Sequence, residues 1–279
     1  DSNPHGCPHA PQTCASANSA TSAEQLQHYS KPALDVKRPT GLIPSSPESG
    51  SPVTRNAPPL ISTSAPLGEV WNELERAPIL ALDLEMDSFY SYFGKVCLIQ
   101  LSTPDSDFLL DPLAGLELGP LGMILADPSK IKILHAGEND IPYLRGPLGF
   151  GTVRSVFDTY LAARILGYAR CGLAALLEEH FQVQLDKDMQ TADWRQRPLS
   201  PEQEEYARTD TRYLIQLREV LLAELSEQGK LEQASSEFDR ILDRVHVPRQ
   251  FDPAGWTRMR GARDLNGLGR AILRELYRW

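Results

Sequence analysis

Two acidic residues lie inside one of the most apolar stretches of the chain. Asp83 and Glu85 are two positions apart in the run 79–86, which is otherwise made of isoleucine, leucine, alanine and methionine. Because side chains alternate between the two faces of a strand, both carboxylates point to the same face. Two buried acids are costly unless something compensates their charge, and carboxylate oxygens are the ligands that Mg²⁺ and Mn²⁺ prefer. The alternative is a strand end that reaches solvent, with one acid capping a turn.

A third acid follows a later expected strand. Asp140 comes shortly after His135, at the start of an expected helix. In a sheet covered by helices, functional groups converge at the ends of the strands. An acid at a helix start also stabilises the helix through its dipole, so Asp140 alone leaves both interpretations open.

A tyrosine and an acid share one face of a long expected helix. Tyr206 and Asp210 are four residues apart, which places the phenol and the carboxylate side by side on an α-helix. Such pairs are common on amphipathic helices, so this pair indicates a functional site only together with the other acids.

Hydrophobic periodicity predicts an α/β fold with strands that alternate with helices. Three early strands at hairpin spacing, followed by strands and helices in alternation, indicate a mixed sheet with helices on its faces. Ser200, Pro201 and the acids after them start a long helix that could run to about Glu227. The expected strands are 78–86, 95–103, 107–111, 130–136 and 153–157, and the other expected helices are 116–126, 139–144, 158–166 and 173–180.

The three acidic segments together resemble the exonuclease motifs of the DEDD superfamily, and specifically its tyrosine branch, the ribonuclease D-like enzymes. The segments 83–85, 135–140 and 206–210 match the first, second and third motifs in order and separation. The stretches 185–187 and 193–199 are also similar to the region that leads into the third motif in ribonuclease D. The resemblance covers roughly residues 67–230 and implies a ribonuclease H-like, mixed five-stranded sheet flanked by helices.

The resemblance also implies a role for each matched residue. Two divalent cations, Mg²⁺ or Mn²⁺, would serve phosphodiester hydrolysis, with Asp83 bridging both. Glu85 and Asp210 would complete the site of the attacking water, and Asp140 would support the second ion. Tyr206 would position the nucleophile, because its ordinary pKa of about 10 makes it a poor base near neutral pH.

Other residues support weaker hypotheses. Gln100 is a polar residue within a strand and could face the 3′ nucleotide, and Lys187 and Arg197 could contact phosphates or form ion pairs. His135 ends an apolar strand and is expected to be a structural histidine. Asp158 resembles a recurring family position, but capping of the next helix explains it equally well.

Composition divides the chain into three parts. Residues 1–66 hold 11 of the 22 prolines and have Tyr29 as their one aromatic residue, which predicts a disordered segment. Residues 67–238, the expected exonuclease domain, carry 15 basic and 28 acidic side chains. An acidic domain that handles a polyanion requires cations between the two. The four cysteines are too few for a disulfide scaffold, and no apolar run approaches the roughly 20 residues of a membrane helix.

Residues 239–279 carry nine arginines against five acids. The pattern of residues 253–279, with Trp256, Gly261 and Leu268, resembles the opening of an HRDC domain, the helical module that follows the nuclease in ribonuclease D. We therefore expect a linker and a partial HRDC-like helical element, whose basic charge could help to hold the RNA backbone. The alternative is an appended amphipathic helix with a solvated basic face.

These expectations converge on a 3′–5′ exoribonuclease that releases nucleoside 5′-monophosphates, with tRNA precursors or other structured RNA as substrate. Two alternatives of the same class are a nuclear, exosome-associated type of RNA exonuclease and a DNA-directed 3′–5′ exonuclease. A nonhydrolytic RNA-binding or scaffolding protein is the alternative of another class. An intracellular location, cytoplasmic or nuclear, fits the absence of a recognisable secretory signal, and no membrane partner is expected.

Overall fold

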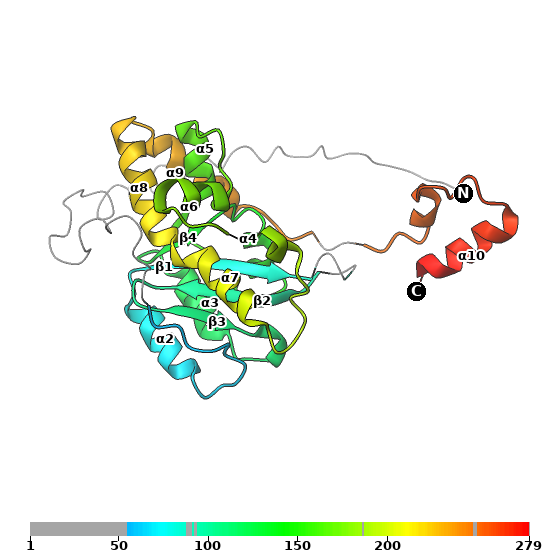
Figure 1. Ribbon diagram of the computed structural model, residues 1–279, viewed down its shortest axis with the longest axis horizontal. Helices are drawn as coiled ribbons and strands as arrows, with labels where there is room; N and C mark the ends of the chain where they lie inside the picture. Colours follow the sequence, from blue (N-terminus) through cyan, green and yellow to red (C-terminus); the bar gives the residue numbers. More distant parts are fainter. Residues whose placement is uncertain (1–54, 88–90, 92–93, 186, 248–249, 279) are drawn as a thin grey trace, which may run out of the picture. The chain divides into compact units, whose positions relative to one another are not determined.

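The computed structural model describes residues 55–278 except 88–90, 92–93, 186 and 248–249 (Figure 1). Within these residues a five-stranded sheet has the order β3-β2-β1-β4-β5. The β1–β2 and β2–β3 pairs are antiparallel, and the β1–β4 and β4–β5 pairs are parallel, so the expected mixed sheet is confirmed. The strands are β1 (Ile79–Met86), β2 (Val96–Ser102), β3 (Asp107–Leu110), β4 (Ile131–Leu134) and β5 (Val156–Asp158).

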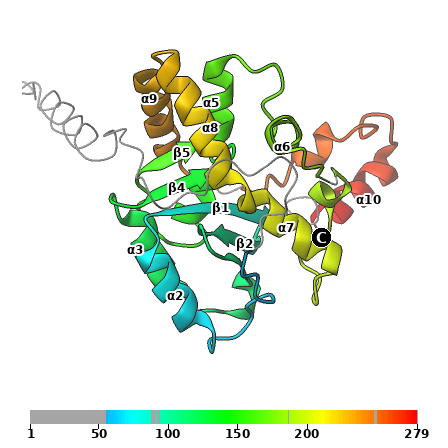
Figure 2. The same cartoon turned by 60° about the vertical axis from the view of Figure 1, so that its left-hand side comes forward.

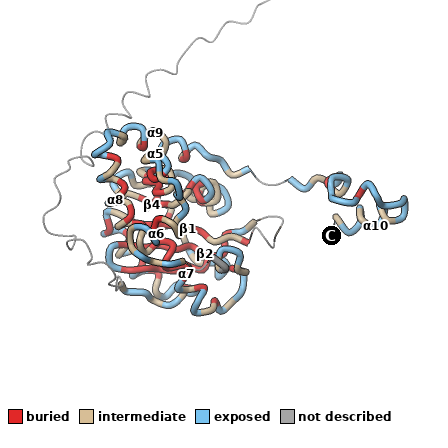
Figure 3. Tube along the Cα trace, turned by 45° about the horizontal axis from the view of Figure 1, so that its top comes forward, coloured by how far each residue is buried: buried red, intermediate tan, exposed pale blue. Residues whose placement is uncertain are grey.

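Helices cover both faces of the sheet. Leu80, Leu82 and Leu84 of β1 belong to a buried cluster with α2 (Leu67–Arg76) and α3 (Gly119–Ala126). Ala81, on the opposite face, packs with α5 (Thr159–Leu166), α6 (Leu173–Phe181) and α8 (Leu214–Glu227). In Figure 2, α2 and α3 lie together, apart from the group formed by α5, α8 and α9. Buried positions concentrate in the strands, and the outer sides of the helices are exposed (Figure 3).

The helix that carries the third acidic segment is shorter than expected. Ser200 forms a capping box with Gln203 at the start of α7 (Pro201–Arg212), as the sequence indicated. The helix ends at Tyr213, where α8 begins, instead of continuing to Glu227. The hydroxyls of Thr209 and Thr211 donate to backbone carbonyls in the preceding turn, a contact that favours helix bending. The result is that α7 lies over β1, β2 and β3, while α8 packs against β1 and β4.

Two helices were not expected from the sequence. One is α2, and the other is α9 (Leu231–Leu242). The boundary expected at residue 238 falls inside α9, where Phe238 contacts Phe157 of β5 with ring centroids 4.8 Å apart. Ala234, Phe238 and Ile241 are buried, which ties this helix to the nuclease-like sheet domain rather than to a linker. Two short 3₁₀ segments, η1 (Pro112–Ala114) and η2 (Lys187–Thr191), complete the connections around the domain.

Residues 55–66 are ordered, which corrects the expectation of disorder for this part of the segment 1–66. The backbone of Ile61 donates to Leu109 and accepts from Asp111, so the chain runs beside β3. The Ile61 side chain is 4% exposed and belongs to the core. The sequence shows only the short apolar pair Leu60 and Ile61 here, and composition does not reveal the neighbouring strand that buries Ile61. The expectation for residues 1–54 lies outside the described residues.

Asp107 joins this segment to α7 through buried ion pairs. Its carboxylate accepts hydrogen bonds from Ser102 Oγ at 2.7 Å, Arg212 Nε at 2.7 Å and Arg55 Nη1 at 3.3 Å. The Asp107 and Arg55 side chains are 1% and 2% exposed. The backbone carbonyls of Asp107 and Pro58 both accept from Arg208 of α7. The segment 55–61 and α7 are therefore held to the same edge of the sheet.

Replacing Asp107 with alanine is expected to lower the free energy of unfolding by about 3 kcal/mol or more, because Arg55 would remain buried without its carboxylate partner and Arg212 would keep only its pair with the exposed Glu205. Urea denaturation measures this loss. Glu237→Ala removes the exposed pair with Arg240 and serves as a control, with an expected cost under about 1 kcal/mol. Equal losses in the two variants would contradict the structural role of Asp107.

The C-terminal residues form a small helical part. It contains η3 (Gly255–Arg258) and α10 (Gly267–Arg278), and Phe251 stacks on Tyr277 with centroids 5.4 Å apart. Leu268, Ile272 and Leu276 of α10 are exposed. The helical character agrees with the sequence expectation, and the HRDC-like assignment stays a prediction. Among the described residues, every helix is too short or too polar to span a bilayer.

Candidate active site

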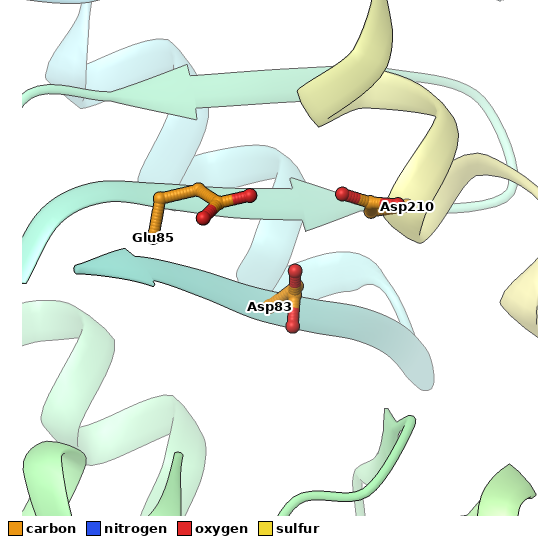
Figure 4. Close-up of side chains that lie close together, drawn as sticks. All are labelled: Asp83, Glu85 and Asp210. Carbon is orange, nitrogen blue, oxygen red and sulfur yellow. The ribbon is translucent and has the colours of Figure 1, made fainter. Parts of the chain in front are cut away.

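Three carboxylates meet where α7 crosses β1. Asp83 and Glu85 project from the same face of β1, and Asp210 approaches from α7 (Figure 4). One oxygen of each residue lies within 4.8 Å of the others. Period-two alternation in the strand and the packing of α7 over β1 and β2 produce this arrangement. The expected convergence of the first and third acidic segments is therefore observed.

The electrostatics of this cluster are unfavourable without a cation. Burial raises the pKa of Asp83 to about 7. Burial and the charges of Asp83, Asp210 and Asp140 raise the pKa of Glu85 well above its usual value. Burial and the charge of Asp83 do the same to the pKa of Asp210. A divalent cation would reverse these shifts, because it favours the charged form of each carboxylate.

The donor set of the cluster fits Mg²⁺ or Mn²⁺. All three converging groups are carboxylates, and hard cations bind oxygen ligands of this kind. Neither a histidine nor a cysteine belongs to this group of ligands, so zinc is disfavoured by the chemistry of the donors.

Asp140 lies beside the three carboxylates but is not one of the group within 4.8 Å. It is 5% exposed and directly precedes α4 (Ile141–Arg145). Burial and the charges of Asp83 and Asp158 raise its pKa well above the usual value. Its charge in turn raises the pKa of Glu85. Asp140 is therefore close enough to act on the cluster electrostatically.

A tight turn between β4 and α4 carries Asp140 to this position. Ala136 has a positive φ of 59°, and a Cβ on Gly137 would lie 2.8 Å from Leu134 Cδ2, so glycine is required there. Asp158 accepts from the backbone N–H of Gly137 at 2.7 Å and, more weakly, from that of Ala136 at 3.4 Å. The same carboxylate accepts from Leu161 N at 2.8 Å and so caps α5. One side chain thus stabilises a helix and holds the turn before Asp140.

Substituting Asp158 with serine should separate these two roles. Serine caps a helix well, but its single hydroxyl cannot also reach the turn before Asp140. We expect the melting temperature to stay close to that of the wild type while divalent-metal affinity falls about 10- to 100-fold, as for other residues that support metal ligands. Calorimetric titration with Mn²⁺ measures the affinity. Wild-type affinity in Asp158→Ser would reduce Asp158 to a helix cap.

Tyr206 is positioned to act on Asp210. A hydrogen bond from the Tyr206 side chain partly offsets the raised pKa of Asp210. Burial and then the charges of Asp210, Glu85 and Asp83 raise the pKa of Tyr206 far above its usual value. The phenol is therefore a proton donor to the carboxylate at neutral pH. The ring packs against buried Trp194, with centroids 6.1 Å apart, which fixes its orientation.

Arg197 forms an ion pair, which is one of the two roles that the sequence left open, and its guanidinium is not free to bind a phosphate. Its five N–H groups all donate within the protein. Nε and one Nη2 hydrogen form a bidentate pair with Asp111, and the other Nη2 hydrogen donates to Cys97 O. Nη1 donates to the carbonyls of Trp194 and Gln196. Arg197 therefore anchors the loop before α7 to the sheet. Its carboxylate partner, Asp111, is 86 residues away in the chain, so local sequence patterns do not reveal the pair.

The expected substrate contacts of Gln100 and Lys187 differ in what the structure says of them. The Gln100 side chain is fully buried, so it cannot touch an RNA that approaches over the surface, and the expected contact with the 3′ nucleotide is corrected. The backbone of Lys187 belongs to η2, but its side chain lies outside the described part of the structure, so its role stays a prediction.

His135 has the structural role expected from its place at the end of an apolar strand. Its Nδ1 lies 2.9 Å from Thr159 Oγ1. Burial lowers the pKa of His135 to about 4, so the ring is uncharged at neutral pH.

Asp158 supports the site in a way that the sequence did not reveal, although its role as a helix cap was visible there. Its bond to Gly137 depends on the pairing of β4 with β5, where Leu134 lies opposite Asp158.

Comparisons with known proteins agree with this geometry. The family model described as a 3′-5′ exonuclease matches residues 58–226. The Exosome complex component 10 homolog of Drosophila melanogaster is 38% identical over 62% of this chain and 20% of the relative. The exosome complex exonuclease RRP6 of Saccharomyces cerevisiae is 32% identical over 91% of this chain and 35% of the relative. Ribonuclease D of Gluconacetobacter diazotrophicus is 33% identical over 80% of this chain and 56% of the relative.

Solved structures show the same fold. The catalytic core of RRP6 from Trypanosoma brucei superposes with a TM-score of 0.71 and 27% identity, covering 83% of this chain and 65% of that one. Ribonuclease D of Escherichia coli gives a TM-score of 0.62 and 32% identity, covering 79% of this chain and 58% of that one. The chain spans between 20% and 35% of the length of the exosome relatives from fly, worm and yeast. Because the family model covers more than half of the chain, the chain belongs to the 3′-5′ exonuclease family.

Proposed function

We propose that this chain is a divalent-metal-dependent 3′–5′ exoribonuclease that releases nucleoside 5′-monophosphates from RNA 3′ ends. The observation that carries the proposal is the meeting of Asp83, Glu85 and Asp210 within 4.8 Å. Asp210 is buried and Asp83 and Glu85 are half-buried, and the charge of Asp83 raises the pKa of both Glu85 and Asp210. Such a cluster is hard to explain in a folded protein unless it binds cations.

Each acidic residue has a proposed part in the reaction. Asp83 would contact two Mg²⁺ or Mn²⁺ ions, and Glu85 and Asp210 would complete the site next to the attacking water. Asp140 would support the second ion. When bound, such ions lower the pKa of water and stabilise charge on the entering and leaving oxygens. The Tyr206 hydroxyl donates to Asp210 and orients the carboxylate beside the nucleophile.

RNA is the proposed substrate. The curated relatives include enzymes named ribonuclease D, and the Escherichia coli structure is titled as an exoribonuclease involved in structured RNA processing. Other relatives are exosome components, so an exosome-associated role is equally compatible with the family. Processing of tRNA or other structured RNA, and the intracellular location, stay predictions. A nonhydrolytic scaffold is disfavoured because all four acids and Tyr206 are present and grouped.

The proposal is tested with 5′-labelled RNA and DNA strands of the same sequence. With Mg²⁺ we expect a ladder that shortens from the 3′ end of RNA, mononucleotide products, and no shortening in the presence of EDTA. Shortening of DNA at a higher rate would make the enzyme a DNA exonuclease. Binding of RNA without any metal-dependent shortening would support the scaffold and overturn the proposal.

Tyr206→Phe provides a test of the positioning role. The variant retains the ring that packs on Trp194 and loses the hydrogen bond to Asp210. Because hydrogen bonds to charged groups contribute about 1.5–3 kcal/mol, we expect kcat to fall roughly 10- to 100-fold with little change in KM. Tyr277→Phe, on α10, is the matched control with wild-type kcat. An unchanged kcat in Tyr206→Phe would remove Tyr206 from the mechanism.

A further inference from the structure

The side chain of Gln100 is an anomaly in the sheet. It is fully buried, and neither its Nε2 nor its Oε1 has a hydrogen-bond partner. Buried amides nearly always have partners, because an unpaired donor or acceptor is destabilising. Gln100 is flanked in β2 by Ile99 and Leu101, both also fully buried. An apolar side chain would therefore suit the fold better than this amide.

The register of the sheet places Gln100 beside the carboxylate cluster. Asp83 of β1 lies directly opposite Gln100, and Leu109 of β3 lies opposite it on the other side. Residues opposite each other in an antiparallel pair share a face, with Cβ atoms about 4.5–5.5 Å apart. The Gln100 amide is therefore on the same face as the Asp83 carboxylate and within reach of it.

Helix α7 covers Gln100 from above. On one side of Gln100 along β2, Leu98 packs in a cluster with Tyr206 and Ala207. On the other side, Ser102 Oγ lies 2.7 Å from Thr211 Oγ1. These two contacts place the stretch of α7 that contains Asp210 over Gln100. The amide thus lies in the floor of the cluster, between β1 and α7, where water and RNA do not reach it.

We propose that Gln100 is a positioning residue whose amide donates a hydrogen bond to the Asp83 carboxylate when divalent cations draw the cluster together. This proposal rests on the proposed metal-dependent function. Its N–H groups are donors of the kind that orient ligating carboxylates in metal sites. An unpaired buried amide destabilises the fold. The neighbouring Asp83 carboxylate is the group to which this amide could donate a hydrogen bond.

The test compares Gln100→Leu with Gln100→Met and with a matched control, Gln216→Leu. Gln216 lies on α8, and its Oε1 is also buried without a partner. We expect Gln100→Leu and Gln100→Met to melt at or above the wild-type temperature in EDTA, because an unpaired amide is removed. We expect their Mn²⁺ affinity, measured by calorimetry, to fall about 10- to 100-fold. Gln216→Leu should bind Mn²⁺ as the wild type does.

A double-substitution cycle identifies the partner. If Gln100 acts through Asp83, adding Gln100→Leu to Asp83→Asn should weaken Mn²⁺ binding no further than Asp83→Asn alone. Wild-type Mn²⁺ affinity in both Gln100 variants, or equal losses in Gln216→Leu, would overturn the proposal. Additive losses in the cycle would also overturn it. A wild-type chain that binds Mn²⁺ but does not shorten RNA would refute the nuclease function, and the Mn²⁺ titrations would still decide the role of Gln100.

Discussion

Asp210→Asn is expected to lower the rate of mononucleotide release at least about a thousandfold. The change removes one of three charges that converge within 4.8 Å, so the cluster would hold its cations less tightly and in a different arrangement. A loss of several kcal/mol of transition-state stabilisation corresponds to this factor, since 1.36 kcal/mol is tenfold in rate. Initial rates on labelled RNA with Mg²⁺ provide the measurement.

The same variant should be more stable than the wild type in EDTA. Burial and the charge of Asp83 both oppose ionisation of Asp210, so a neutral amide relieves this strain on the metal-free fold. Glu202→Gln, at an exposed position in the first turn of the same helix, is the control and should retain the wild-type rate, with a loss of stability of at most about 1 kcal/mol because it removes a negative charge from the helix N-terminus. Wild-type turnover in Asp210→Asn would exclude Asp210 from the site. Unfolding of the variant would show that the carboxylate is structural.

Stabilisation by Mg²⁺ should increase strongly as the pH rises from about 5 to 8. Carboxylates with a folded-state pKa above the unfolded value stabilise the fold fully at pH values below the unfolded pKa, near 4. This contribution is lost as the pH rises through the folded-state value, which is about 7 for Asp83. The pKa values of Glu85 and Asp210 are raised in the same direction. Metal-free protein should therefore lose stability over this range.

Bound cations oppose that loss because they favour the ionised carboxylates. We expect the difference in melting temperature between Mg²⁺ and EDTA to be small near pH 5 and to reach several degrees by pH 8. Thermal denaturation at fixed ionic strength measures both curves. Asp83→Asn should flatten the dependence. A difference that does not change with pH would contradict the raised pKa values, and a difference of zero would contradict metal binding.

Much of the site could be predicted from local patterns. Alternation within a strand placed Asp83 and Glu85 on one face, and helical spacing placed Tyr206 next to Asp210. The mixed sheet followed from the order of strands and helices along the chain and from hairpin spacing, and the structure has both the antiparallel and the parallel pairs of such a sheet. These features depend on neighbours in the sequence, where periodicity carries the information.

Features that depend on distant partners could not be predicted in this way. Arg197 is occupied by Asp111, which lies at the end of β3, and Ile61 is buried because the chain before α2 runs beside that strand. Asp158 looked like a helix cap, and its second bond, to Gly137, requires the β4–β5 pair. Gln100 looked exposed to substrate, but α7 covers it. In each case tertiary contacts decided what a side chain could reach.

The central claim is that Asp83, Glu85 and Asp210 bind a pair of divalent cations. The most direct measurement is a crystal structure of the wild-type protein with Mn²⁺, with the ions located by anomalous scattering. We predict two peaks about 3.5–4 Å apart at these carboxylates, with Asp140 beside the second ion. A protein that shortens RNA with Mn²⁺ but shows no peak at this cluster, or shows its peaks at other residues, would contradict the account.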